Sequence, residues 1–154
     1  MEQSSRQKRL PLAATPELFI RLATLGQFFV DLHTLESAEV HGDVATYIGQ
    51  ASAVIDHVEH GDRTMWINAK RKAGFRGVDD AVRHFQIGGY QVCEKWLKDR
   101  KRPMLSGEDI AHYQKIVVAL SETIRIQKEI DEVIEAHGGW PGAFAGTVPE
   151  GGEA

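Results

Sequence analysis

Residues 85–102 read FQIGGYQVCEKWLKDRKR, and they join a double glycine to a cationic segment of helical spacing. Two glycines free the backbone for a tight turn, so Gly88-Gly89 predicts a strand-to-helix turn. Residues before a proline avoid the helical region, so we expect the helix to end at Arg102-Pro103. Trp96 lies on one side of this helix. Mostly on the other side lie five cations: Lys95, Lys98, Arg100, Lys101 and Arg102.

Positive charge is concentrated in the middle of a chain whose formal net charge is -4. Residues 62–102 hold 11 Lys/Arg and 5 Asp/Glu, which gives this segment a charge of +6, whereas the remainder carries -10. A basic middle between acidic ends is an electrostatic footprint that the net value hides, and it can meet a polyanion. A solvated helix face produces the same run of charges, so both interpretations stand at this point.

Length and composition favour one domain with a core of its own. The chain has 154 residues, and 42% of them are hydrophobic. Cys93 is its single cysteine, which excludes an intrachain disulfide and fits the reducing cytoplasm. No apolar run reaches the roughly 18 residues of a membrane span. We expect flexible segments at residues 1–14 and 141–154, on either side of a domain over residues 15–140.

The N-terminal half predicts one helix followed by a small sheet. Thr15-Pro16-Glu17 is a helix-start signal, and leucines at three- and four-residue steps extend the helix to about Leu35. Runs of β-branched and aromatic residues then predict strands at residues 46–48, 53–58 and 64–68, with Glu59–Arg63 as a hairpin loop. We expect residues 70–74 to form a basic loop and residues 79–83 to form a cap and a short helix.

The C-terminal half predicts one long helix over residues 107–137. Ser106 is its cap, acidic residues occupy its first turn, and Gly138-Gly139 ends it. Two apolar flanks follow an approximate heptad. About thirty residues at 1.5 Å each span roughly 45 Å, which is longer than a small domain needs. We therefore expect part of this helix to pack on a partner subunit or on a second copy of the chain.

Other candidate sites have simpler structural interpretations. His57-Val58-Glu59-His60 holds zinc-ligand residue types, but residues three apart point to opposite faces of a strand, which favours a surface hairpin. Cys93 and His84 could form a nucleophile and base, although a lone cysteine is better read as a small buried hydrophobe. Asp79-Asp80 is read as a helix cap. We expect the Tyr90 and Trp96 rings to be core anchors rather than base-stacking platforms.

Catalytic motifs are missing from the sequence. Gly88-Gly89 is too short for a phosphate loop, and no Gly-Lys-Ser/Thr occurs. An amino-group methyltransferase needs a Gly-rich cofactor loop and an Asn/Asp-Pro-Pro-aromatic motif, but the five prolines are never adjacent. No nuclease pattern of spaced acids and a lysine is evident, and no coherent hydrolase site appears. We therefore expect no catalytic centre, no cofactor and no metal.

The chain resembles a known family in its central and C-terminal parts. The pattern Ile-Gly-Gly-Tyr-x-Val-x-x-Lys-Trp-Leu-Lys-Asp-Arg in residues 87–100 is similar to the C-terminal region of large fused restriction–modification enzymes of the type ISP kind, and of related adenine-specific DNA methyltransferases. The resemblance covers roughly residues 15–140. Further matching segments are Leu25-Gly26, Leu32-His33, Ile67-Asn68, Phe75-x-Gly77-Val78, Leu105-Ser106, Tyr113–Val117 and Glu122–Ile124.

This resemblance implies a DNA target-recognition role in a restriction–modification or anti-phage system. The family has Trp where Arg83 stands, and Gly-Arg where Arg102-Pro103 stands. Its methyltransferase and helicase or nuclease regions have no counterpart here, so we expect a standalone protein, a split subunit or a gene fragment, without catalysis of its own. Implied partners are duplex DNA and a methyltransferase or restriction subunit.

The sequence therefore predicts an α+β fold, with a small antiparallel sheet packed with helices and a long C-terminal helix. Its predicted function is DNA binding. A protein–protein or oligomerisation module through helix 107–137 is the alternative. Base readout is assigned to the loop residues Asn68, Arg76 and Gln86. The predicted DNA contacts are Lys70, Arg71, Lys72, Arg76, Lys95, Lys98, Arg100, Lys101 and Arg102.

Overall fold

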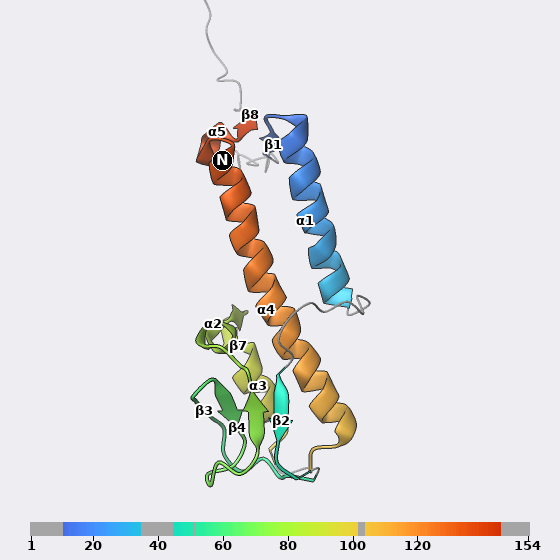
Figure 1. Cartoon of the computed structure of the whole chain (residues 1–154), viewed down its shortest axis with the longest axis vertical. Coiled ribbons are helices and arrows are strands. Elements are labelled where there is room, and N and C mark those ends of the chain that lie inside the picture. Colours follow the sequence, from blue (N-terminus) through green and yellow to red (C-terminus); the bar gives the residue numbers. More distant parts are fainter. Residues whose placement is uncertain (1–10, 35–44, 51, 102–103, 146–154) are drawn as a thin grey trace, which may run out of the picture. The chain divides into compact units, whose positions relative to one another are not determined.

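The structure, a computed structural model, describes residues 11–34, 45–50, 52–101 and 104–145 (Figure 1). It confirms the α+β class. Its residues cluster in two units, one from residues 1–28 and 127–154 and one from residues 29–126. The expectations for residues 1–10, 102–103 and 146–154, which include Arg102 as a DNA contact, lie outside the described residues. No described helix is long and apolar enough to cross a membrane.

The unit of residues 29–126 contains a four-stranded antiparallel sheet in the order β2-β5-β4-β3. The strands are β2 Thr46–Ile48, β3 Glu59–Gly61, β4 Thr64–Trp66 and β5 Gly74–Arg76. The prediction assigned Gly74 to a loop, and this was wrong, because β5 lies between β2 and β4. A Cβ on Gly74 would lie 2.6 Å from the carbonyl oxygen of Met65, so the strand needs glycine there.

The predicted strand at residues 53–58 was also wrong. Only Val54 pairs in this segment, in an isolated bridge with Met104, and Asp56 N–H donates to the Ile67 carbonyl. The segment Glu59–Arg63, predicted as a loop, instead supplies strand β3 and a two-residue turn. Asp62 and Arg63 both have φ 53°, as a type I′ hairpin turn requires. The strand β3 was missed because its residues are polar and do not form the β-branched and aromatic run by which strands were predicted.

The double glycine lies at the tip of a small hairpin rather than directly before a helix. Strands β6 Gln86–Ile87 and β7 Tyr90–Gln91 flank it, and Gly88 and Gly89 have φ 60° and 83°. Helix α3 then runs over Val92–Asp99, so it ends three residues earlier than predicted. Tyr90 is 62% exposed and is not the core anchor that was predicted. The glycines therefore close a tight turn, as predicted, but between two strands.

Helix α4, Gly107–Ala136, confirms the predicted long helix. Ser106 Oγ accepts the Asp109 N–H at 3.0 Å and donates to Asp109 Oδ2 at 2.8 Å, and the two groups form a reciprocal cap. Tyr113, Val117 and Leu120 of α4 belong to the same buried cluster as Phe75 of β5. The helix thus covers the sheet with its first apolar flank. Helix α2, Asp80–His84, completes this unit, and its Val82 is buried in the same cluster.

Trp96 confirms its predicted role as a core anchor. It is partly buried against the cluster, and its ring lies 5.2 Å from that of Tyr113. The chain of aromatic rings continues from Tyr113 to Phe75 at 4.3 Å and from Phe75 to Tyr47 at 5.2 Å. Cys93 and Leu97 of α3 are fully buried beside them. These contacts fix the position of α3 against the sheet and α4.

The other unit consists of chain ends that pair with each other. Helix α1, Pro16–Thr34, begins where Thr15 Oγ1 accepts the Leu18 N–H at 3.2 Å. Strand β1, Leu12–Ala13, pairs with β8, Phe144–Ala145, within segments predicted to be flexible. The one-turn helix α5, Gly139–Gly142, follows α4 at the predicted stop.

Candidate nucleic-acid interface

The basic loop at residues 67–73 is built by its own hydrogen bonds. Asn68 Oδ1 accepts the Lys72 N–H at 2.8 Å, and Asp56 Oδ1 accepts the Ala69 N–H at 3.1 Å. The Ile67 N–H donates to the Ala73 carbonyl at 3.0 Å and closes the loop. Asn68, predicted to read bases, therefore has its side-chain oxygen engaged in shaping the loop. Lys70 and Lys72 are exposed on it.

Arg71 of this loop is bound to the neighbouring strand. Its Nη2 lies 2.6 Å from Oε1 of Glu59 in β3, and both side chains are close to half exposed. The hydrogen bond from Arg71 lowers the pKa of the Glu59 carboxyl, and the same bond raises the pKa of Arg71. Exposed ion pairs contribute little stability, so this pair can exchange its carboxylate for a phosphate.

Most cations of α3 are paired within their own helix. Lys95 Nζ lies 2.7 Å from Asp99 Oδ2, and Lys98 Nζ lies 2.5 Å from Glu94 Oε1. Lys95 also lies over the Tyr90 ring at 5.4 Å. Bonding to Asp99 raises the pKa of Lys95. Within the described ranges, Lys101 makes no ion pair, as is true of Lys70, Lys72 and Arg76.

A short segment connects the basic loop with the chain that follows α3. Asp56 holds the loop through Ala69, while the Ala53 carbonyl accepts the Leu105 N–H at 3.1 Å. Asp56 is three positions after Ala53, so the Cα atoms of these two residues lie at most about 11 Å apart. The loop and the residue 104–105 segment therefore lie at one end of this unit. Through residues 53–56, these contacts link two parts of the chain that are about thirty residues apart in sequence.

Arg76 and Gln86 are located elsewhere in the unit. Arg76 is exposed at the far end of β5 from the basic loop, where it pairs with Thr46 and Thr64 across the sheet. Gln86 is exposed in β6 and pairs with Gln91. The structure gives no contact that groups either residue with the loop.

Arg100 differs from the other cations because another helix holds it. Its guanidinium carbon lies 3.7 Å from the centre of the Trp96 ring, and its Nε lies 3.6 Å from Asp109 Oδ1 of α4. Asp109 Oδ2 meanwhile accepts the Ser106 N–H at 3.0 Å, and its bonds with Ser106 lower the pKa of the Asp109 carboxyl, with a further contribution from Arg100. Arg100 is thus fixed between a ring and a carboxylate.

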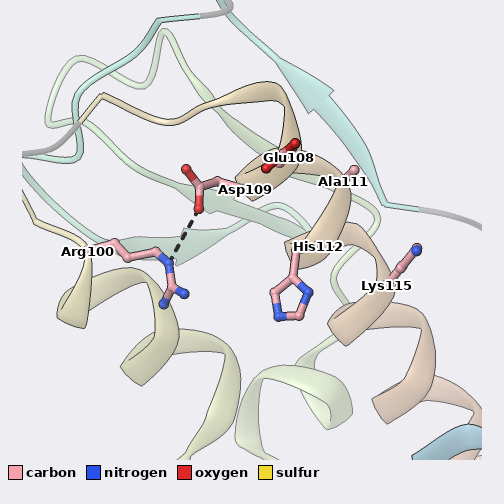
Figure 2. A pocket seen from close by; sticks show the side chains of 6 residues that line it. All are labelled: Arg100, Glu108, Asp109, Ala111, His112 and Lys115. Atoms are coloured by element: carbon pink, nitrogen blue, oxygen red, sulfur yellow. Dashed lines mark ion pairs between the residues drawn. The ribbon is translucent and has the colours of Figure 1, made fainter. Parts of the chain in front are cut away.

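An open groove of about 520 Å³ lies beside Arg100 (Figure 2). Figure 2 shows the Arg100 guanidinium and the His112 ring on opposite sides of this groove, below Asp109. His112 also lies near Trp96, with 5.8 Å between the ring centres. The groove is lined by Arg100, Glu108, Asp109, Ala111, His112 and Lys115.

His112 and Lys115 are not among the site residues that the sequence predicted. Their spacing from Glu108, at four and seven residues, places all three on one helix face, and this was the available signal. Only the packing of α3 on α4 shows that Arg100 lies beside this face.

The described residues show neither of the two other sites considered from the sequence, a metal site and a cysteine nucleophile. Across the described ranges, no three His, Cys, Asp or Glu residues form a metal cluster. The His60 ring is engaged by the Val78 carbonyl at 2.8 Å and by Asp80 at 3.3 Å. Cys93 is fully buried, as predicted for a small hydrophobe. This burial raises the pKa of its thiol to about 11. A protonated, inaccessible thiol is not a nucleophile.

Comparison with known proteins identifies a family for this chain. The family model described as Type ISP C-terminal specificity domain matches residues 5–129. This range includes the whole unit of residues 29–126, with the basic loop, α3 and the groove. No curated protein and no solved structure matches the chain.

Proposed function

The chain belongs to the Type ISP C-terminal specificity domain family, and we propose that it is a DNA-binding, target-recognition module of a restriction–modification system. Family membership over residues 5–129 is the observation that carries this proposal. It favours DNA over a solvated face as the explanation of the basic middle segment. We expect the chain to act in the cytoplasm, in defence against phage.

The exposed cations support contact with a nucleic-acid backbone. Lys70, Lys72 and Lys101 are exposed and make no ion pair among the described residues. Lysine is among the side chains that contact phosphates, and such contacts position a protein without reading sequence. Arg71, Lys95 and Lys98 need only exchange one exposed carboxylate for a phosphate.

The proposal is tested by the salt dependence of binding. We expect the chain to bind duplex DNA with a logarithmic affinity that falls steeply and linearly with the logarithm of salt concentration. Replacing Lys70, Lys72 and Lys101 together with Ala should lower the slope by about 3, since each phosphate contact contributes about 0.9. Fluorescence anisotropy with a labelled duplex measures both quantities.

A control variant that removes two positive charges elsewhere separates local contacts from overall charge. Arg21 on α1 and Lys128 on α4 are exposed and belong to the other unit, so the double variant Arg21→Ala, Lys128→Ala should bind almost as the wild type does. Absence of duplex binding at low salt would remove the proposal. If the triple variant and the control variant both keep the salt slope of the wild type, the DNA surface lies elsewhere on the chain.

We propose that catalysis belongs to another polypeptide or another region, such as a methyltransferase or restriction subunit. The groove is an open surface site, and Cys93 is buried and protonated. We expect duplex DNA that is incubated with the chain, Mg²⁺ and S-adenosylmethionine to remain uncut and unmethylated. Methyl transfer or cleavage by the purified chain would contradict this assignment.

A protein–protein module is the second candidate, and one observation favours it. Four large apolar side chains of α1 are more than half exposed: Phe19, Ile20, Phe28 and Val30. A soluble chain rarely displays such a set along one helix unless a partner covers it. This surface lies outside the basic segment, so both functions can coexist.

A further inference from the structure

We propose that the groove between α3 and the start of α4 reads a G·C base pair, with Arg100 as the guanine-reading residue. This inference rests on the proposed DNA-binding function and deepens it. It also changes the role of Arg100, which the sequence grouped with the phosphate contacts. Three properties of the groove lead to it: its lining, the fixation of Arg100 and the use of Asp109.

The lining of the groove suits a base better than a phosphate. Arg100, His112 and Lys115 supply donors, while Glu108 and Asp109 supply acceptors. A phosphate offers only acceptor oxygens and negative charge, so two carboxylates beside it would repel it. A base edge offers donors and acceptors together, and a G·C pair presents guanine O6 and N7 as acceptors next to the cytosine N4 donor.

Arg100 is held in the way that a base-reading arginine requires. Stacking on Trp96 orients the plane of its guanidinium, and Nε lies 3.6 Å from Asp109 Oδ1 in an ion pair. Arg100 lines the groove, and its two Nη groups lie on the side of the guanidinium away from Asp109 (Figure 2). A guanidinium fork that is already ordered loses less conformational entropy on binding, and two parallel N–H donors match guanine O6 and N7.

The lysines of the same region lack this fixation. Lys95 and Lys98 pair with acids one turn away on their own helix, Lys95 also lies over the Tyr90 ring at 5.4 Å, and Lys101 makes no ion pair within the described ranges. A flexible ammonium serves a phosphate as a point charge and specifies no base. Arg100 is therefore the member of the set whose geometry carries sequence information.

Asp109 is a positioning residue and Glu108 is the second reading group. Both Asp109 oxygens are used, Oδ1 by Arg100 and Oδ2 by Ser106, so Asp109 orients Arg100 rather than meeting DNA. Glu108 is exposed in the groove and makes no ion pair among the described residues. A free carboxylate at this position can accept the N4 donor of a cytosine.

The experiment is selection of binding sites by the full chain from a pool of duplexes with randomised sequence. The wild type should enrich a motif that contains a G·C pair. Arg100→Lys keeps the charge but loses the fork, so it should lose the preference at that one pair by on the order of 5- to 150-fold, with its salt slope unchanged. Lys101→Ala should instead weaken binding to all sequences alike and keep the motif.

Two more variants keep the inference testable if Arg100→Lys does not fold. Glu108→Gln changes an exposed side chain, and it should relax the choice of cytosine at the same pair or the adjacent one. Asp109→Asn should weaken guanine preference less than Arg100→Lys does, because it loosens Arg100 without removing it.

Each outcome bears on one claim. A wild type that binds no duplex defeats the proposed function itself. A wild type that binds without any motif leaves DNA binding intact and overturns the base-reading role of the groove. A motif that Arg100→Lys, or Glu108→Gln in its place, retains unchanged at every position also overturns it.

Discussion

At the scale of single residues, equal charges occupy very different environments. Lys98 and Arg100 are two positions apart, yet Lys98 pairs with an acid of its own helix and Arg100 pairs with an acid of α4. The exposed fractions of these two side chains, 50% and 38%, differ little. Partner identity, not exposure, distinguishes them. A count of charges over the basic segment does not reveal this difference in ion-pair partners.

Gly74 gives a prediction about stability at this scale. A methyl group there would meet the Met65 carbonyl oxygen at 2.6 Å, which backbone atoms cannot relieve without moving β4 from β5. Gly74→Ala should destabilise the chain by about 1–3 kcal/mol, the usual cost of overpacking. Urea denaturation measures it. Gly107→Ala, where nothing lies within 4 Å, should remain within about 0.5 kcal/mol, and equal losses in both variants would contradict the explanation.

Cys93 gives a prediction about reactivity. Burial keeps its side chain from solvent and raises the pKa of the thiol to about 11, so at pH 8 it is protonated as well as inaccessible. We expect a colourless disulfide reagent such as Ellman's reagent to leave the folded chain unmodified for hours and to react at once in denaturant. Fast reaction of the folded chain would mean that α3 opens readily from the core.

At the scale of elements, local capping explains why the start of α4 was predictable. The Ser106–Asp109 pair is a sequence signature four residues long, and the structure forms both of its reciprocal bonds. Strand β5 is the opposite case. It has three residues, begins with glycine and ends with an exposed arginine, and its central position comes only from partners on both sides.

The capping pair gives a prediction about pH. Its bonds lower the pKa of the Asp109 carboxyl in the folded chain, so the unfolded chain binds the proton first as pH falls. The stability from this group is present above its ordinary pKa of 3.8 and is lost as pH falls through the lower folded value. The difference in unfolding free energy between the wild type and Asp109→Asn should therefore be constant above about pH 5 and shrink near pH 3.

Chemical denaturation at several pH values tests this sign. Ser106→Ala serves as the comparison, because it removes the hydroxyl partner but not the titrating group. It should cost about 1 kcal/mol at neutral pH. A difference for Asp109→Asn that grows as pH falls would contradict the assigned role of Asp109.

At the scale of the whole molecule, the exposed apolar side chains of α1 predict association. Replacing Phe19 and Phe28 with Ser removes two large side chains that are 65% and 51% exposed. We expect the wild type to gain mass with concentration in sedimentation velocity and this double variant to gain less. Thr24→Ala, also exposed on α1, is the control. A wild type that stays monomeric at high concentration would exclude self-association and leave a different partner for this surface.

The sequence by itself determined the elements that rest on local rules. The helix starts at Thr15 and Ser106, the length of α4, the tight turn at Gly88-Gly89 and the buried thiol each follow from caps, periodicity or composition within a few residues. The resemblance in residues 87–100 also pointed to the family that the match over residues 5–129 shows. Charge patterning identified the basic segment but not the partners of its members.

Only the tertiary structure decided how residues distant in sequence are grouped. The hairpin at Glu59–Trp66, the central place of β5 and the approach of Ala53 to Leu105 depend on pairing between segments, which local patterns do not encode. The same holds for Arg100. Its charge is visible in the sequence, but its fixed geometry comes from a ring four residues back and a carboxylate on another helix. Packing turned one of five similar cations into a candidate for reading a base.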